Sequence, residues 1–380
     1  MSMAEERVIK IGMLGLGTVG TGVYKVLKSQ QEEMLPKLGA RVELKKFSCA
    51  MWKKQLQRLM IRRSLPRTLR TLPMTRRLRL LLRLWVETAG YELHSCLPGC
   101  RKECCNGKQR SGGIRGQKNP CNSKEKRKRF LYEASVAGGI PIIRPVKQCL
   151  AANHITELMG IFNGTTNFIL TKMSQENMDY ADVLREAQEK GYAESDPTAD
   201  VGGLDAARKL VILASIAFNT RIDLSDVLVE GIDGLDLCDI EHGKELGYAI
   251  KLLAIAKNNA EHGISVCVRP TMLPVSHPLA GVNDVFNAIF VTGDAIGDAM
   301  FMGRGAGKMP TASAVCGDII DVARNIIHKS NGRINCTCFD EKHLCSLENM
   351  MSPCYIRLHV QDKPGVLAAI AAAFGAQNVS

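Results

Sequence analysis

The chain has 380 residues, which is enough for two or three domains with sizeable hydrophobic cores. Its formal net charge is +12, and its 46% hydrophobic content with 34 Gly is typical of an α/β protein. No run of about 18 uncharged apolar residues occurs, which excludes a membrane-spanning helix. The first 15 residues lack a secretory signal, so we expect a cytoplasmic protein with no membrane partner.

The N-terminal residues 7–28 have the order strand, G-x-G-x-x-G, helix. Gly15 permits a tight turn, Gly17 lets the backbone approach a pyrophosphate, and Gly20 lets helix and strand pack closely. The first N–H groups of the helix, with its dipole, favour phosphate. A Gly-rich turn in another βαβ unit is the alternative interpretation. The predicted cofactor-binding residues here are Gly15, Leu16, Gly17, Thr18, Val19 and Gly20.

The segment 47–128 differs from the rest of the chain. It holds 21 Lys and Arg against four Glu, a net charge of +17, so the remainder sums to −5. Three interpretations compete: a basic arm that follows nucleic-acid phosphates, a metal site, or a segment translated out of frame. The metal site would lack the paired CxxC units of zinc proteins and would use Cys96, Cys100, Cys104 and Cys105.

Residues 130–145 predict a strand followed by a Gly-Gly turn, and residues 155–162 predict another strand. The polar cluster 163–167 follows, before an apolar helix, and a further helix over 180–190 ends at Gly191.

Acids then crowd a short loop and the start of the next helix. Asp205 and Lys209 are four residues apart, which places them on one face of a helix. An exposed ion pair is the common alternative for such spacing. It does not account for the other nearby acids, which are Glu194, Asp196 and Asp200.

The region 130–330 resembles homoserine dehydrogenase. The segments that carry the resemblance are 160–168, 191–197, 200–209, 276–280, 286–290, 303–307 and 310–314. The resemblance implies an α/β fold. It would have a Rossmann-type NAD(P)-binding domain over 1–135 with its second half disrupted, an α+β substrate and dimerisation domain with an open sheet over 136–330, and a truncated ACT (ferredoxin-like) domain over 350–380.

The resemblance also implies the reaction, which is reduction of L-aspartate-4-semialdehyde to L-homoserine by NADH or NADPH. Lys209 would donate the proton to the developing alkoxide, a cation where negative charge appears. Asp205 would orient Lys209 or the reacting end of the substrate. Glu194 would bind the amino and hydroxyl groups of the substrate, and Asp200 would support that end.

Further sites follow from the resemblance alone. Glu133 and the backbone carbonyls of Val136, Gly138 and Ile140 resemble a monovalent-cation site, with Na⁺ the expected ion. Oxygen ligands suit a hard cation rather than zinc. Gly305, in the loop 303–307, resembles a second cofactor-binding position. Strands expected over 264–270 and 285–291 resemble the sheet that forms the family's dimer contact, so we expect a homodimer or higher homo-oligomer.

Residues 355–367 predict a strand, a turn and a helix start, and they resemble the opening of an ACT module. The printed sequence contains about half of such a module. Because half a sheet cannot bury its apolar face, we expect residues 350–380 to be poorly packed.

The resemblance favours the out-of-frame interpretation of segment 47–128. Codons can be chosen for 103–113 that, read from the second base, give Val-Thr-Ala-Asn-Lys, a family segment with an active-site lysine. Codons for 47–58 and 66–88, read from the third base, also give family-like runs, the first with an Arg that suits NADP. A doubly wound sheet needs buried parallel strands, which this basic block is not expected to supply. We therefore expect weak cofactor binding and low activity.

The rival interpretation is a non-enzymatic basic binding protein, or an inactive relic, that keeps the substrate domain as a scaffold. The intact acid and lysine set around residues 194–209 argues against it. We expect a small-molecule substrate, homoserine or the semialdehyde, and no nucleic-acid partner.

Overall fold

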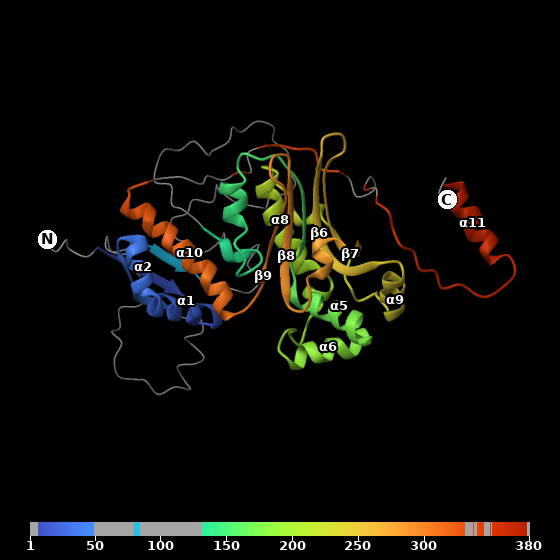
Figure 1. The fold of residues 1–380 in the computed structure, drawn as a ribbon, viewed down its shortest axis with the longest axis horizontal. Helices are drawn as coiled ribbons and strands as arrows, with labels where there is room; N and C mark the ends of the chain where they lie inside the picture. Colours follow the sequence, from blue (N-terminus) through green and yellow to red (C-terminus); the bar gives the residue numbers. More distant parts are fainter. Residues whose placement is uncertain are drawn as a thin grey trace, which may run out of the picture. The chain divides into compact units, whose positions relative to one another are not determined.

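The computed structural model describes residues 7–48, 80–83, 131–330, 337, 340–345, 350 and 352–377. The chain divides into two compact units, 1–347 and 348–380. The fold is α/β, and two sheets lie in the first unit (Figure 1). Among the helices that the structure describes, none combines the length and apolar character needed to cross a membrane.

The N-terminal sheet is parallel and has the strand order β2-β1-β3. Ile9, Ile11 and Met13 of the central strand β1 are buried and form part of the hydrophobic core beside this sheet. The elements of this part are β1 (Val8–Leu14), α1 (Thr18–Ser29), α2 (Gln31–Leu38), β2 (Arg41–Ser48) and β3 (Leu80–Arg83). The predicted strand, glycine turn and helix are therefore present, in that order.

β3 comes from the basic segment. It pairs parallel with β1 over four residues, from Ile11 opposite Leu80 to Leu14 opposite Arg83. The expectation that this segment supplies no parallel strand is therefore wrong for 80–83, where four consecutive residues form the ladder beside β1. The metal and nucleic-acid interpretations of the segment lie outside the described residues.

A long helix from late in the chain completes the N-terminal core. α10 (Lys308–Ile327) lies against α1, as Figure 1 shows. A Cβ at Gly22 would lie 2.6 Å from the Lys308 carbonyl oxygen and 2.9 Å from Cβ of Ala312. Gly22 therefore permits the close approach of the two helices. The core of the N-terminal sheet includes residues of α10 and so extends beyond the predicted residues 1–135.

The second sheet has six strands in the order β5-β7-β6-β4-β8-β9. The β5–β7 pair is parallel and the other pairs are antiparallel. The strands are β4 (Ile155–Ile161), β5 (Leu228–Val229), β6 (Tyr248–Asn259), β7 (Gly263–Pro274), β8 (Phe286–Gly293) and β9 (Gly297–Arg304). The predicted strands over 155–162, 264–270 and 285–291 are confirmed.

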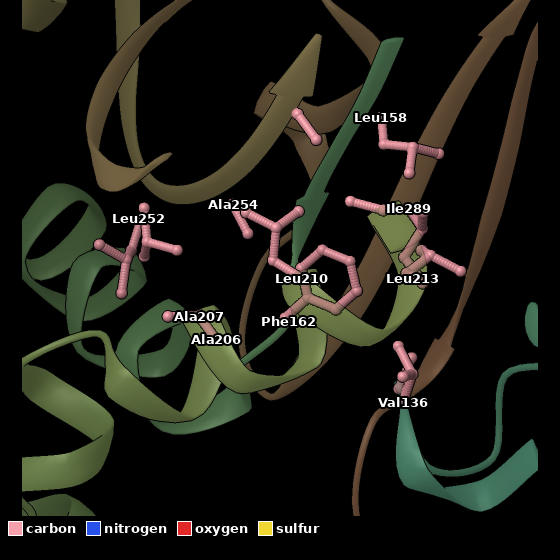
Figure 2. Packing of buried hydrophobic residues seen from close by; sticks show 14 of the residues in the cluster. Val136, Leu158, Phe162, Ala206, Ala207, Leu210, Leu213, Leu252, Ala254 and Ile289 are labelled. Atoms are coloured by element: carbon pink, nitrogen blue, oxygen red, sulfur yellow. The ribbon is translucent and has the colours of Figure 1, made fainter. Parts of the chain in front are cut away.

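Helices cover one face of this sheet. α5 (Gly164–Glu176) and α8 (Leu204–Ala217) pack on it, and Leu210 and Leu213 of α8 are fully buried. Figure 2 shows these leucines beside Phe162 and among strand residues such as Leu158 and Ile289. This packing fixes the axis of α8, which carries the predicted catalytic pair.

Shorter elements connect these parts. They are η2 (Glu133–Ser135), η3 (Pro145–Cys149), α6 (Tyr180–Glu189), α7 (Thr198–Val201), η4 (Leu224–Asp226), α9 (Leu237–Glu245) and η5 (Pro278–Gly281). The strand predicted at the start of 130–145 is wrong. Residues 133–135 form a helical turn, and Ala137 and Gly138 have φ of 53° and 52°, which a strand does not allow.

The second unit holds α11 (Val366–Ala376), where a helix start was predicted. The strand predicted for residues 355–361 is not formed in this described stretch. A lone strand has no ladder partner to satisfy its N–H and C=O groups. Leu358, Val360 and Leu367 of the unit are exposed, with Leu367 at 80%, and Val366, Ile370 and Phe374 of α11 are only half-buried.

Candidate active site

The glycine turn between β1 and α1 has the geometry of a phosphate-binding loop. Gly15 has φ of 97°, a left-handed value that favours glycine. Gly17 is the N-cap residue of α1, no side chain caps this end, and a Cβ at Gly17 would meet no atom within 4 Å. Leu16, Gly17 and Thr18 are exposed. The open helix N-terminus therefore leaves its first N–H groups to a phosphate ligand.

Gly305, the other predicted cofactor position, lies in the connection between β9 and α10. A Cβ there would lie 2.0 Å from Nδ2 of Asn287, and a Cβ at Gly138 would lie 2.0 Å from the Gly305 carbonyl oxygen. Gly305 therefore packs tightly between the 136–140 turn and β8. Since α10 starts at Lys308 and packs on α1, this connection joins the six-stranded sheet to the N-terminal sheet and its helices.

The predicted pair on α8 forms. Lys209 Nζ donates to Asp205 Oδ2 at 2.6 Å and to the Phe162 carbonyl oxygen at 2.9 Å. Phe162 directly follows the last residue of β4, so the ammonium is held by residues of both the helix and the sheet. The side chains of Lys209 and Asp205 are 22% and 30% exposed, so a small molecule can reach them.

Asn163 links this pair to Asp200. Its Nδ2 donates to Asp200 Oδ1 at 2.7 Å and to Asp205 Oδ2 at 2.9 Å. Its Oδ1 accepts from the backbone N–H of Thr166 at 3.0 Å and so caps α5. The polar cluster 163–167 therefore belongs to the site, although Asn163 was not among the predicted site residues.

The electrostatic surroundings of Asp200 are mixed. Burial raises the pKa of the Asp200 carboxyl, and the hydrogen bond from Asn163 lowers it. The negative charge of Asp205 raises this pKa, and the positive charge of Lys209 lowers it. Glu194 is exposed and adds a smaller raising effect, which places its carboxylate in the same electrostatic neighbourhood. Of the predicted acids, Asp196 instead accepts from the Thr198 hydroxyl at 2.6 Å and caps the turn that begins α7.

A second polar cluster supports the start of β8. Asn167 Nδ2 lies 3.1, 3.0 and 3.1 Å from the carbonyl oxygens of Val282, Asp284 and Phe286. Lys251 Nζ donates to the Val282 carbonyl oxygen at 2.6 Å. These buried bonds hold the 282–286 loop against α5 and β6, next to the N-terminus of α5.

The predicted cation ligand Glu133 has a structural role. Its Oε1 accepts from the backbone N–H groups of Ile142 and Ile143 at 2.7 and 2.8 Å, and its Oε2 accepts from that of Arg144 at 2.9 Å. The carboxylate therefore caps the turn that starts near Ile143. Oε2 keeps a lone pair that a cation can use. The cation site with the carbonyls of Val136, Gly138 and Ile140 stays a prediction.

One group of possible metal ligands lies close together among the described residues. Asp236, Cys238 and Asp239 offer ligand atoms within 4.8 Å of one another. Asp236 and Asp239 form a reciprocal capping box at the start of α9, which explains their proximity without an ion.

A parallel sheet with a glycine loop before α1, joined through α10 to a mixed sheet with an acid and lysine site, is the arrangement of a dinucleotide-dependent dehydrogenase. The model of the homoserine dehydrogenase family matches residues 141–320.

Relatives agree with this match. The homoserine dehydrogenase of Bacillus subtilis (strain 168) is 38% identical over 376 residues, which are 98% of this chain and 86% of that protein. That of Corynebacterium glutamicum is 48% identical over 255 residues, which are 66% of this chain and 57% of that protein. The solved homoserine dehydrogenase of Thiobacillus denitrificans superposes with a TM-score of 0.72 at 30% identity, covering 98% and 87% of the two chains. The chain belongs to the homoserine dehydrogenase family.

Proposed function

We propose that this chain reduces L-aspartate-4-semialdehyde to L-homoserine with NAD(P)H, a step in threonine, methionine and isoleucine biosynthesis. The observation that carries the proposal is the Lys209 ammonium, held by Asp205 and the Phe162 carbonyl oxygen at a partly exposed position. Family membership supports the substrate, and the open glycine loop before α1 supports the cofactor. NADP and NAD both remain candidates.

Lys209 acts on the substrate oxygen. Its two hydrogen bonds leave one N–H of the ammonium to donate. A bound nicotinamide cofactor would supply the hydride, with its electron pair, that the aldehyde carbon accepts. The electron pair of the C=O π bond moves to the oxygen, which takes a proton from Nζ, and solvent reprotonates the lysine. A fixed cation beside this oxygen stabilises the negative charge as it develops.

Glu194 and Asp200 bind the amino-acid end of the substrate. Glu194 is exposed and able to reach a ligand ammonium, and Asp200 lies deeper beside Asn163. Asp205 orients Lys209 through the 2.6 Å bond. Three carboxylates around one lysine favour a cationic substrate group over an anionic one.

The cofactor's phosphates would lie at Gly15, Leu16, Gly17, Thr18, Val19 and Gly20. Gly305 would be a second cofactor-binding position, as the family resemblance implies. A side chain there has no room, because a Cβ would lie 2.0 Å from Asn287 Nδ2. Glu133, with the carbonyls of residues 136, 138 and 140, would hold Na⁺ and stiffen the turn under Gly305.

We also propose a homodimer built on the second sheet. The face opposite α8 carries an apolar cluster of Ile161, Leu253 and Ala288, with Met159 and Phe290 only partly buried. A half-covered apolar sheet face is a natural surface for a second copy. The cytoplasmic location stays a prediction of the N-terminal sequence.

The test measures turnover of L-homoserine with NADP⁺ or NAD⁺. The absorbance of the reduced nicotinamide monitors the reaction. A chimera should accompany the chain, with residues 47–128 replaced by the corresponding segment of the Bacillus subtilis relative. We expect ordinary enzyme rates from the chimera and weak cofactor binding by the chain itself. A chimera that binds cofactor but does not turn over homoserine would overturn the proposed function. Ordinary rates from the unaltered chain would overturn the prediction about segment 47–128.

A further inference from the structure

Asn163 occupies the junction between β4 and α5, where the acids of two other elements meet. It is buried, with 6% of its surface exposed. Its amide contacts Asp200 at the end of α7 and Asp205 in the first turn of α8, 37 and 42 residues along the chain. One short side chain therefore joins three elements at the centre of the site.

The orientation of the Asn163 amide is fixed by the helix that it caps. Oδ1 accepts from the Thr166 backbone N–H at 3.0 Å and lies 3.3 Å from the Thr166 hydroxyl. Because the oxygen is committed to α5, both amide hydrogens face away from the helix. The bond to Asp200 uses one of them and the bond to Asp205 uses the other, so the donor capacity of the amide is filled.

We propose that Asn163 is a positioning residue of the reaction, which holds the Asp200 and Asp205 carboxylates at a fixed separation. One bond acts on the acid beside the substrate, and the other acts on the acid that orients Lys209. The inference rests on the proposed function for its kinetic consequence, but the hydrogen-bond geometry stands without it.

An amide suits this position better than a charged donor. Two carboxylates close together repel each other, and a neutral N–H₂ bridges them without competing with the Lys209 cation. The bond from Asn163 also opposes the rise that burial gives to the pKa of Asp200. Loss of the bridge should therefore raise this pKa and leave Asp205 free to rotate away from Lys209.

Two variants separate the bridge from the helix cap. Asn163→Ser keeps a good N-cap and removes both donors to the acids. Asn163→Asp also keeps a cap and places a third negative charge beside Asp200 and Asp205. The matched control is Asn167→Ser, since Asn167 is 1% exposed in the same helix and its amide holds the 282–286 loop instead of the acids.

The first measurement is a titration of Asp200 by ¹³C NMR in the full-length chain, with the signal assigned by comparison with Asp200→Asn. We expect the Asp200 titration to move to higher pH in Asn163→Ser and further in Asn163→Asp, and to stay in place in Asn167→Ser. An Asp200 titration that is unmoved in both Asn163 variants would overturn the proposal. This readout needs no turnover, so it is independent of the proposed function.

The second measurement is the pH profile of kcat/KM for homoserine. Asn163→Ser loses both hydrogen bonds to the acids, so we expect kcat to fall about 10-fold or more. We also expect the acidic limb of the profile to move to higher pH. In Asn167→Ser the limb should stay in place while stability falls. If the acidic limb lies at the same pH in Asn163→Ser and Asn167→Ser, the role of Asn163 is structural only. The kinetic variants are made in the chimera, because the chain itself is expected to bind cofactor weakly. A chimera that binds cofactor without turning over homoserine would count against the proposed function, and the NMR titration would still decide the role of Asn163.

Discussion

Lys251 provides a sharp test of how burial affects stability in this fold. Its side chain lies on β6 and is buried, with 3% of the residue exposed. Its ammonium donates to the Val282 carbonyl oxygen at 2.6 Å and to Asn283 Oδ1 at 3.0 Å, and it lies 3.4 Å from Asn167 Oδ1. These acceptors are uncharged. Burial therefore lowers the pKa of Lys251 to about 8, although the charge of Asp284 opposes this.

The lowered pKa makes stability depend on pH. Between pH 8 and about 10.5 the unfolded chain keeps a proton on this lysine that the folded chain has lost. Since stability rises with pH wherever the unfolded state binds more protons, the free energy of unfolding should rise across this window. A shift from 10.5 to about 8 corresponds to about 3 kcal/mol at most.

Lys251→Met removes the titrating group and keeps a flexible, unbranched side chain of similar length. As the pH rises from 7 to 10, we expect the free energy of unfolding of the wild type to increase by about 2–3 kcal/mol relative to that of the variant. Urea unfolding at four pH values, monitored by circular dichroism, measures it. Lys257→Met is the control, because Lys257 lies on the same strand with its side chain 55% exposed. A wild-type-minus-variant difference that is constant with pH would refute this reasoning.

Three further predictions concern packing and catalysis. Gly138→Ala should cost several kcal/mol more than Gly191→Ala in thermal unfolding. Both positions have positive φ, but only a Cβ at Gly138 would meet backbone, 2.0 Å from the Gly305 carbonyl oxygen. Leu210→Ala should lower the urea unfolding free energy by about 3–5 kcal/mol, because Leu210 is fully buried beneath the sheet; a loss below 1 kcal/mol would contradict the packing in Figure 2. Lys209→Met should reduce kcat by about 100-fold or more with circular dichroism unchanged, and retained activity would exclude Lys209 as the proton donor.

Local patterns in the sequence predicted much of the fold. The strand, glycine turn and helix at the N-terminus follow from short-range rules, because φ at Gly15 and the helix start at Thr18 depend on adjacent residues. The ion pair of Asp205 and Lys209 is predicted by helical periodicity, since residues four apart face the same side. The family resemblance extended these local predictions to the substrate sheet.

Predictions failed where an element depends on a distant partner. The expected strand near residue 133 is replaced by a turn, because the Glu133 carboxylate caps the N–H groups of residues 142–144 and its own N–H bonds to Asp318, 185 residues away. The strand expected near residue 355 is not formed, because pairing requires a second strand that the described residues do not provide. β3 formed in a basic segment because the edge of β1 supplies a ladder partner.

The sequence by itself determined the chemistry that is available: a glycine turn before a helix, a lysine with an acid one helical turn before it, and further acids nearby. The tertiary structure alone decided which of these groups meet. Asn163 contacts acids 37 and 42 residues away, and α10 packs on α1 across almost 300 residues. Backbone preferences act over a few residues, whereas such contacts arise only when sheet pairing and core packing bring distant segments together.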